Sequence, residues 1–237
     1  MKKTIITGLL IFVFIIGITI AIGFSKEKES KDKAVKHEEL VALGDSLTHG
    51  VGDAGAGYAG NLQKALTENQ HNTVTVHNFG IPGQQSDGLL DQLKGEDIRE
   101  RINKADYIIL FIGTNDLVKT NGGDLSRIYE DRIEVGKEDY TRNLKDILAI
   151  IRKENDDAPV LLLGLFNPYP SSEEIEEVVN DWNSTSKEIV SHDKRVKYIP
   201  TNGLFKEKSK TYFSDALHPN SEGYELITKK IIEEYDF

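Results

Sequence analysis

The sequence predicts an α/β protein whose parallel sheet is covered by helices on both faces. Short runs of apolar and β-branched residues alternate with longer segments in which apolar residues recur every three or four positions. The first pattern is typical of buried strands and the second of amphipathic helices. Their alternation implies parallel strands joined by crossover helices, and therefore three layers.

Five segments are predicted to be strands. Each is short, rich in apolar and β-branched residues, and bounded by Gly, Pro, Asn or Asp, which commonly end strands. They are residues 40–43, 73–79, 106–112, 159–165 and 196–200. We therefore expect a five-stranded parallel sheet.

Helices are predicted between these strands and after the last one. They cover residues 58–66, 88–102, 139–154, 172–190 and 221–235. The final helix follows Pro219, with Asn220 or Ser221 suited to be its N-cap. Residues 118–137 fit neither pattern, so we expect an insertion or a mobile loop there.

The N-terminal part differs from the rest of the chain. Residues 4–24 contain no charged side chain and reach the roughly 20 residues that a helix needs to cross a membrane. A cleaved signal peptide is the alternative, although its apolar region is usually only about 7–15 residues long. We expect a transmembrane helix within residues 1–24, a charged tether at 25–39 and a folded domain at 40–237.

Charge and composition narrow the location and the partners. Lys2 and Lys3 precede the apolar segment, which favours a domain outside the cytoplasm, anchored to the cell membrane or secreted after cleavage. The net charge of −10 disfavours nucleic acid as a partner, because phosphate backbones would be repelled. The absence of cysteine excludes disulfides and thiolate metal sites. No pattern sets an oligomeric state.

Polar residues and glycines follow the predicted strands. Ser46 comes after the first strand, Gly80 after the second, Asn115 after the third and Asn167 after the fourth. In an open parallel sheet, ligands bind in the crevice at the carboxyl ends of the strands. We therefore expect these residues to gather at one edge of the sheet.

Four short motifs, in this order, resemble the signature blocks of the SGNH (GDSL-type) hydrolases. They are GDSL at 44–47, N-x-G at 78–80, GTND at 113–116 and DALH at 215–218. The resemblance spans residues 40–237 and implies the three-layer α/β/α, flavodoxin-like fold of that family. It also implies that Ser46 is the nucleophile, that Asp215 and His218 complete a triad, and that Ser46, Gly80 and Asn115 form the oxyanion hole.

The chemistry of these residues agrees with the implied roles. A serine hydroxyl is a weak nucleophile that needs an adjacent base, and a carboxylate must hold that base in one tautomer. His218 and Asp215 can supply both, since they are three residues apart in one loop. The amide of Asn115 and the N–H groups of Gly80 and Ser46 can donate to an oxyanion.

Other interpretations of the same residues remain open. Ser46 and Asn115, taken singly, are common turn and cap residues. Asp45, Asp116 and Asp215 with His218 could form a divalent-metal site of a phosphoesterase. A binding module with a degenerate site is a third class. His49 lies near Ser46 in the sequence and has no assigned role.

The sequence favours a serine hydrolase that cleaves esters or thioesters through an acyl-enzyme, without metal or cofactor. The resemblance allows a lipase or acylhydrolase that acts on lipid esters. A carbohydrate O-deacetylase that acts on acetylated envelope glycans is the alternative. Asn167, in the motif FNPYP at 166–170, is expected to contact the substrate.

Overall fold

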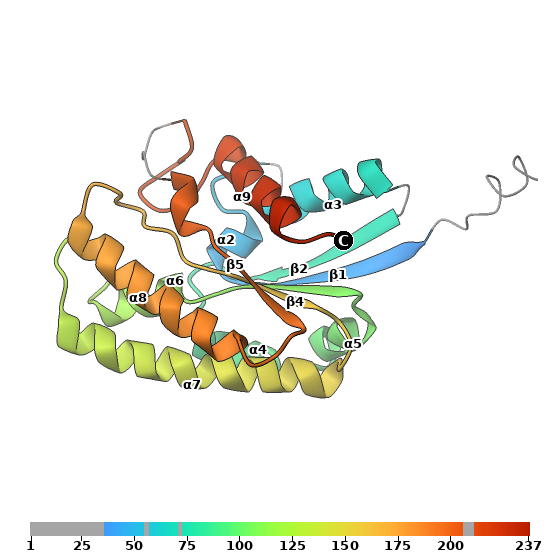
Figure 1. Ribbon diagram of the computed structural model, residues 1–237, viewed down its shortest axis with the longest axis horizontal. Helices are drawn as coiled ribbons and strands as arrows, with labels where there is room; N and C mark the ends of the chain where they lie inside the picture. Colours follow the sequence, from blue (N-terminus) through green and yellow to red (C-terminus); the bar gives the residue numbers. More distant parts are fainter. Residues whose placement is uncertain (1–35, 55–56, 71–72, 206–210) are drawn as a thin grey trace, which may run out of the picture. The chain divides into compact units, whose positions relative to one another are not determined.

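A five-stranded parallel sheet forms the centre of the protein, as predicted. The computed structural model describes residues 36–54, 57–70, 73–205 and 211–237. The strands are β1 (His37–Gly44), β2 (Thr73–Gly80), β3 (Tyr107–Phe111), β4 (Val160–Leu163) and β5 (Val196–Ile199). Their order in the sheet is β2-β1-β3-β4-β5 (Figure 1), which is the flavodoxin-like order.

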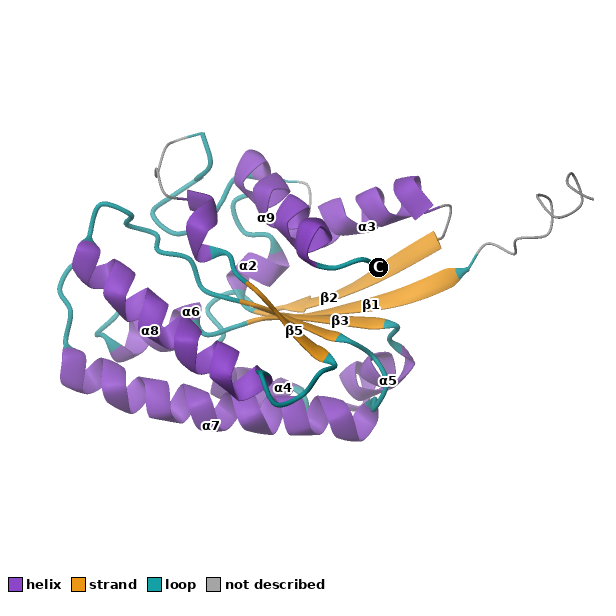
Figure 2. Cartoon of the chain, in the orientation of Figure 1, coloured by secondary structure: helices purple, strands orange, loops and turns teal. Residues whose placement is uncertain are grey.

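Helices cover both faces of this sheet and complete the three layers. They are α2 (Ser46–His49), α3 (Gly57–Gln70), α4 (Ser86–Gln92), α5 (Glu96–Lys104), α6 (Thr114–Thr120), α7 (Glu130–Glu154), α8 (Glu173–Val190) and α9 (Ser221–Glu234), with a 3₁₀ turn η1 at Asn202–Phe205. Figure 2 shows α3 and α9 on one side of the sheet and α4, α5, α7 and α8 on the other. The predicted α/β/α architecture is therefore confirmed.

Successive side chains of β1 pack alternately into two hydrophobic cores, one on each face of the sheet. Val41 and Leu43 pack with the core under α4, α5, α7 and α8, whereas Leu40 and Ala42 pack with α3 and α9. All four are fully buried, because side chains alternate between the faces of a strand and both faces are covered here. This explains why the strands read as continuous apolar runs.

The register of the three central strands aligns their carboxyl ends. Gly44 at the end of β1 pairs with Gly80 of β2 and with Phe111 of β3. A Cβ at Gly44 would lie 2.1 Å from the carbonyl oxygen of Phe111, so only glycine allows this approach. The residues that follow these strands therefore begin at the same edge of the sheet.

The predicted helix at residues 88–102 is two helices. The chain leaves α4 at Leu93, and Gly95 adopts an extended conformation as the N-cap of α5. The break lets Leu93 and Ile98, on either side of it, both reach the same core. The apolar spacing continues across the break, and this misled the sequence-based prediction.

The segment at residues 118–137 is not an irregular insertion throughout. Its first residues belong to α6, and α7 already begins at Glu130. Gly136 lies on α7 at a position where a Cβ would come within 2.3 Å of the Thr120 hydroxyl oxygen. The glycine therefore lets α6 and α7 pack closely, a tertiary reason that outweighs its low helix propensity.

The described domain begins slightly before the predicted boundary. Strand β1 starts at His37, inside the segment predicted as tether. There, Glu39 hydrogen-bonds the imidazoles of His37, at 3.0 Å, and His77 of β2. The predicted transmembrane helix lies outside the described residues. Among the residues that are described, no helix has the length and apolar character that a membrane crossing requires.

Candidate active site

Ser46 lies at the tight connection between β1 and α2. Asp45 is the N-cap of α2, and its carboxylate Oδ1 accepts a hydrogen bond of 2.9 Å from the backbone N–H of Leu47. Gly50 ends this one-turn helix in the left-handed conformation. The serine is thereby fixed as the first residue of α2, directly above the carboxyl end of β1.

His218 and Asp215 reach Ser46 from the loop that precedes α9. An antiparallel bridge between Phe213 and Pro219 closes this loop. The imidazole Nδ1 of His218 lies 2.7 Å from Oδ2 of Asp215, and its Nε2 lies 2.9 Å from the hydroxyl of Ser46. The three residues predicted to form a triad are therefore in hydrogen-bond contact in the expected order.

The environment of Asp215 keeps this carboxylate charged. Burial acts to raise its pKa, but hydrogen bonds from the N–H groups of His218 and Leu217, and from the imidazole, outweigh burial and lower the pKa to about 2. A charged Asp215 accepts the proton of Nδ1, so Nε2 is left as the acceptor for the Ser46 hydroxyl. This is the tautomer that a general base requires.

The groups predicted as oxyanion donors lie at the same edge, and two of them already have partners. The N–H of Gly80 donates to Oδ1 of Asn78, at 2.9 Å. The amide nitrogen of Asn115 donates to Oδ2 of Asp45 and to the carbonyl of Gln84, each at 3.1 Å. The N–H of Ser46 has no hydrogen-bond partner within the described part of the chain.

Gly80 approaches the turn after Ser46 very closely. A Cβ at this position would lie 2.2 Å from the backbone nitrogen of His49, so a side chain would push β2 away from the turn. The imidazole Nδ1 of His49 lies 3.2 Å from the carbonyl oxygen of Gly80. His49, which had no predicted role, therefore rests on the peptide that follows Gly80.

A buried carboxylate joins the loops that follow β2 and β3. Asp116, next to Asn115, accepts hydrogen bonds from the backbone N–H of Ser86, at 3.0–3.1 Å, and from its hydroxyl. Asn143 of α7 donates to the same hydroxyl at 2.9 Å. Burial raises the pKa of Asp116, and the hydrogen bonds from Ser86 oppose this shift. No sequence motif links these positions.

Among the described residues, the acidic side chains that suggested a metal site do not form a group that could hold a metal ion. Asp45 binds Leu47 and Asn115, Asp116 binds Ser86, and Asp215 binds His218. Each carboxylate thus has its own set of N–H or O–H donors. The arrangement matches three separate positioning roles and does not match one shared ion.

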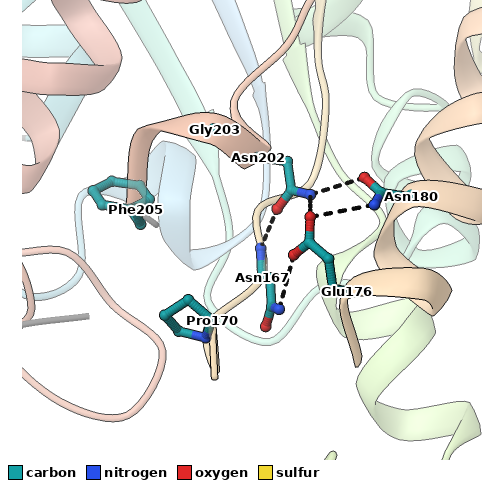
Figure 3. A pocket seen from close by; sticks show the side chains of 7 residues that line it. All are labelled: Asn167, Pro170, Glu176, Asn180, Asn202, Gly203 and Phe205. Atoms are coloured by element: carbon teal, nitrogen blue, oxygen red, sulfur yellow. Dashed lines mark hydrogen bonds between the residues drawn. The ribbon is translucent and has the colours of Figure 1, made fainter. Parts of the chain in front are cut away.

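Asn167 lies after β4 but does not contact the Ser46–His218–Asp215 array. Its amide nitrogen donates to Glu176 at 2.9 Å, and its amide oxygen accepts from the N–H of Tyr169 at 2.7 Å. It lines a polar pocket together with Asn180 and Asn202 (Figure 3). Glu176, Asn180 and Asn202 were missed, because only the fold brings them to the end of β4.

Ser46, His218 and Asp215 are linked by successive hydrogen bonds at the carboxyl edge of a flavodoxin-like sheet. This arrangement defines a serine hydrolase. Residues 42–226 match the GDSL-like Lipase/Acylhydrolase family. The chain therefore belongs to this family, as the four motifs predicted.

Known proteins similar to this chain are consistent with that membership. The Bacillus subtilis (strain 168) protein YpmR, described as uncharacterized, is 33% identical over 217 residues, covering 88% of this chain and 85% of that protein. The spore germination lipase LipC of Bacillus licheniformis is 31% identical over 206 residues, covering 81% and 94%. The crystal structure of the lipase Lip_vut3 from a goat rumen metagenome has a TM-score of 0.76 at 29% identity, covering 83% and 97%.

The protonation of Asp45 is expected to make stability depend on pH. Burial raises the pKa of Asp45 to about 7, despite the hydrogen bonds from Leu47 and Asn115. Between the ordinary value of 3.8 and about 7, the folded protein holds a proton that the unfolded chain has lost. The free energy of unfolding should therefore fall as pH rises through this window, by up to about 1.4 kcal/mol per pH unit.

Urea denaturation of wild type and Asp45→Asn from pH 4 to 8 measures this dependence. The variant cannot titrate at position 45 and should show a flatter profile in that window, whereas the exposed Asp146→Asn should keep the wild-type slope. The effect of Asp215 is separate, because its lowered pKa acts below pH 4. Identical slopes for wild type and Asp45→Asn would mean that Asp45 stays ionised throughout.

Proposed function

We propose that this protein hydrolyses carboxylic esters or thioesters through an acyl-enzyme on Ser46. The observation that carries the proposal is the unbroken chain of contacts from Ser46 through His218 to Asp215, at 2.9 and 2.7 Å. The distances are those of functional hydrogen bonds, and the base is oriented by a charged carboxylate. No cofactor takes part in the proposed reaction.

In the acylation step, Oγ of Ser46 attacks the ester carbonyl carbon while Nε2 of His218 takes the hydroxyl proton. The tetrahedral intermediate collapses when the bond from carbon to the alcohol oxygen breaks, and His218 returns the proton to that oxygen. Water then repeats the sequence on the acyl-serine, which releases the acid and restores the serine. Asp215 stabilises the imidazolium in both steps and keeps its charge.

The oxyanion is stabilised by an exchange of hydrogen-bond partners. The N–H of Ser46 donates directly, since it has no partner within the described residues. The amide of Asn115 releases the carbonyl of Gln84 and donates to the oxyanion instead. The backbone N–H of Gly80 likewise releases the amide oxygen of Asn78 and donates to the oxyanion. Each exchange replaces a neutral acceptor by a charged one, and charge-assisted hydrogen bonds are stronger. The donors therefore bind the transition state better than the ground state.

The substrate class is an acyl ester of a lipid or an acetylated glycan. Membership of the lipase/acylhydrolase family and the similarity to LipC, a spore germination lipase, support the lipid ester. The acetylated glycan is the alternative, and the polar pocket at the end of β4 is the feature that favours it.

Ser46→Ala is expected to abolish ester turnover and leave the fold intact, because the hydroxyl is the only group removed. A fluorophosphonate probe should label the wild type and fail to label this variant. The helix-surface variant Ser184→Ala is the matched control and should be labelled like the wild type. Labelling of Ser46→Ala at another serine would overturn the assignment of the nucleophile.

Asn115→Ala and His218→Ala are expected to differ in size of effect. Loss of an oxyanion donor should lower kcat by roughly 10²–10³-fold with little change in KM, because the donor acts on charge that develops in the transition state. Loss of the base should lower kcat further. Steady-state kinetics with an activated ester measure both, with Asn103→Ala and His192→Ala as controls. A raised KM with normal kcat in Asn115→Ala would make Asn115 a substrate-binding residue instead.

We further propose that residues 1–24 hold the enzyme at the cell membrane with its domain outside the cytoplasm. The uncharged stretch at 4–24 after Lys2 and Lys3 supports this. The intact protein should fractionate with membranes, and external protease should release the domain. Recovery of a chain that starts near residue 25 from the medium would show a cleaved signal instead.

A further inference from the structure

A polar pocket of about 430 Å³ lies at the carboxyl end of β4, and its lining does not include Ser46, His218 or Asp215. Three asparagine side chains and one carboxylate form one side of it, and Phe205 and Pro170 lie on the opposite side (Figure 3). These residues come from the loop after β4, from α8 and from η1. The fold thus gathers the pocket at the same edge of the sheet as Ser46.

Glu176 is the centre of the polar side, and it is held by amides. Its Oε2 accepts from Asn167 at 2.9 Å, and its Oε1 accepts from Asn202 at 2.7 Å and from Asn180 at 3.2 Å. Among the described residues that line the pocket, none is a lysine or an arginine. Within this part of the chain, amide N–H donors therefore stabilise the Glu176 carboxylate, which favours a neutral ligand over an acidic one.

The network retains hydrogen-bonding capacity toward the pocket. One N–H of the Asn180 amide and one lone pair of its oxygen remain after its bonds to Glu176 and Asn202. Within the described part of the chain, Oε2 of Glu176 accepts a single hydrogen bond, and it can take another. Neighbouring donors and acceptors on a rigid frame suit hydroxyl groups, since each hydroxyl both donates and accepts.

Aromatic rings connect this pocket with the loop that carries His218. Phe205, which lines the pocket, packs against Phe213 with ring centroids 5.0 Å apart. Phe213 in turn forms the backbone bridge with Pro219, the residue after His218. The wall of the pocket is therefore continuous with the loop that positions the base.

We propose that this pocket binds the hydroxyl-bearing alcohol part of the ester, a neutral polyol such as a sugar ring or glycerol. The inference rests on the proposed esterase function and adds the chemistry of the leaving alcohol. Glu176 and Asn180 bind two neighbouring hydroxyls, while Pro170 and Phe205 face the carbon skeleton. An acetylated glycan and a monoacylglycerol both carry such a group, and the acyl part stays at Ser46.

Three acetate esters test the proposal because they share the acyl group and differ only in the alcohol. They are 4-nitrophenyl acetate, a mono-O-acetyl methyl xyloside and glycerol monoacetate. Asn180→Ala should raise KM for a polyol acetate relative to KM for 4-nitrophenyl acetate by roughly 3- to 10-fold. Glu176→Gln should raise this ratio by about 10-fold or more, because it removes a charged acceptor. The exposed neighbour Glu177→Gln is the control and should leave the ratio unchanged.

The outcomes separate this proposal from the esterase function. A raised ratio with the xyloside alone identifies a sugar as the alcohol, and a raised ratio with glycerol monoacetate alone identifies glycerol. Unchanged ratios in both variants would overturn the polyol pocket, as would wild-type turnover of 4-nitrophenyl acetate without turnover of either polyol acetate. Absence of turnover with all three esters would instead overturn the esterase function itself.

Discussion

The close contact of β1 with β3 at Gly44 is the constraint on which the site depends. Because no side chain separates Gly44 from the carbonyl of Phe111, the two strands end at the same level and Gly80 of β2 ends beside them. The first residues after each strand then have little freedom of position. Ser46, Gly80 and Asn115 meet for this reason, although they come from three separate crossover units of the chain.

Buried carboxylates hold the residues that follow the aligned strands in fixed positions. Asp45 caps α2 and receives the amide of Asn115, so one side chain orders both the serine turn and an oxyanion donor. Asp116 then binds Ser86 at the start of α4. A buried carboxylate without hydrogen-bond donors would strongly destabilise the fold. Asp45 and Asp116 can therefore position their neighbours only because N–H and O–H donors surround them. The same donors hold the loops after β2 and β3 together.

Local patterns predicted the sheet, its neighbouring helices and the gathering of Ser46, Gly80 and Asn115, because strand ends in a parallel sheet converge by geometry alone. Asp215 and His218 follow no strand, and their place beside Ser46 was implied by the resemblance of their motif to a known family. The break at Gly95 and the early start of α7 at Glu130 were not predictable. At the first place the apolar spacing fits either one helix or two, and at the second a glycine fits either a loop or a helix. Only packing against a distant element decides between these structures. The pairs Asp45–Asn115 and Asp116–Ser86, and the amides around Glu176, join residues far apart in sequence, so no spacing could indicate them.

Three carboxylates illustrate how environment assigns different tasks to one functional group. Asp215 is largely exposed and receives three N–H donors from its own loop, which lower its pKa and keep it charged beside the imidazole. Asp45 is fully buried and has a raised pKa, so it serves better as an orienting acceptor than as a source of charge. Glu176 is held by three amides and keeps free acceptor capacity toward a pocket. Asp215 is the one of the three that binds the imidazole of His218, whereas Asp45 and Glu176 accept hydrogen bonds from amides. The place of each carboxylate in the fold thus determines whether it acts on the base, on an oxyanion donor or on the pocket.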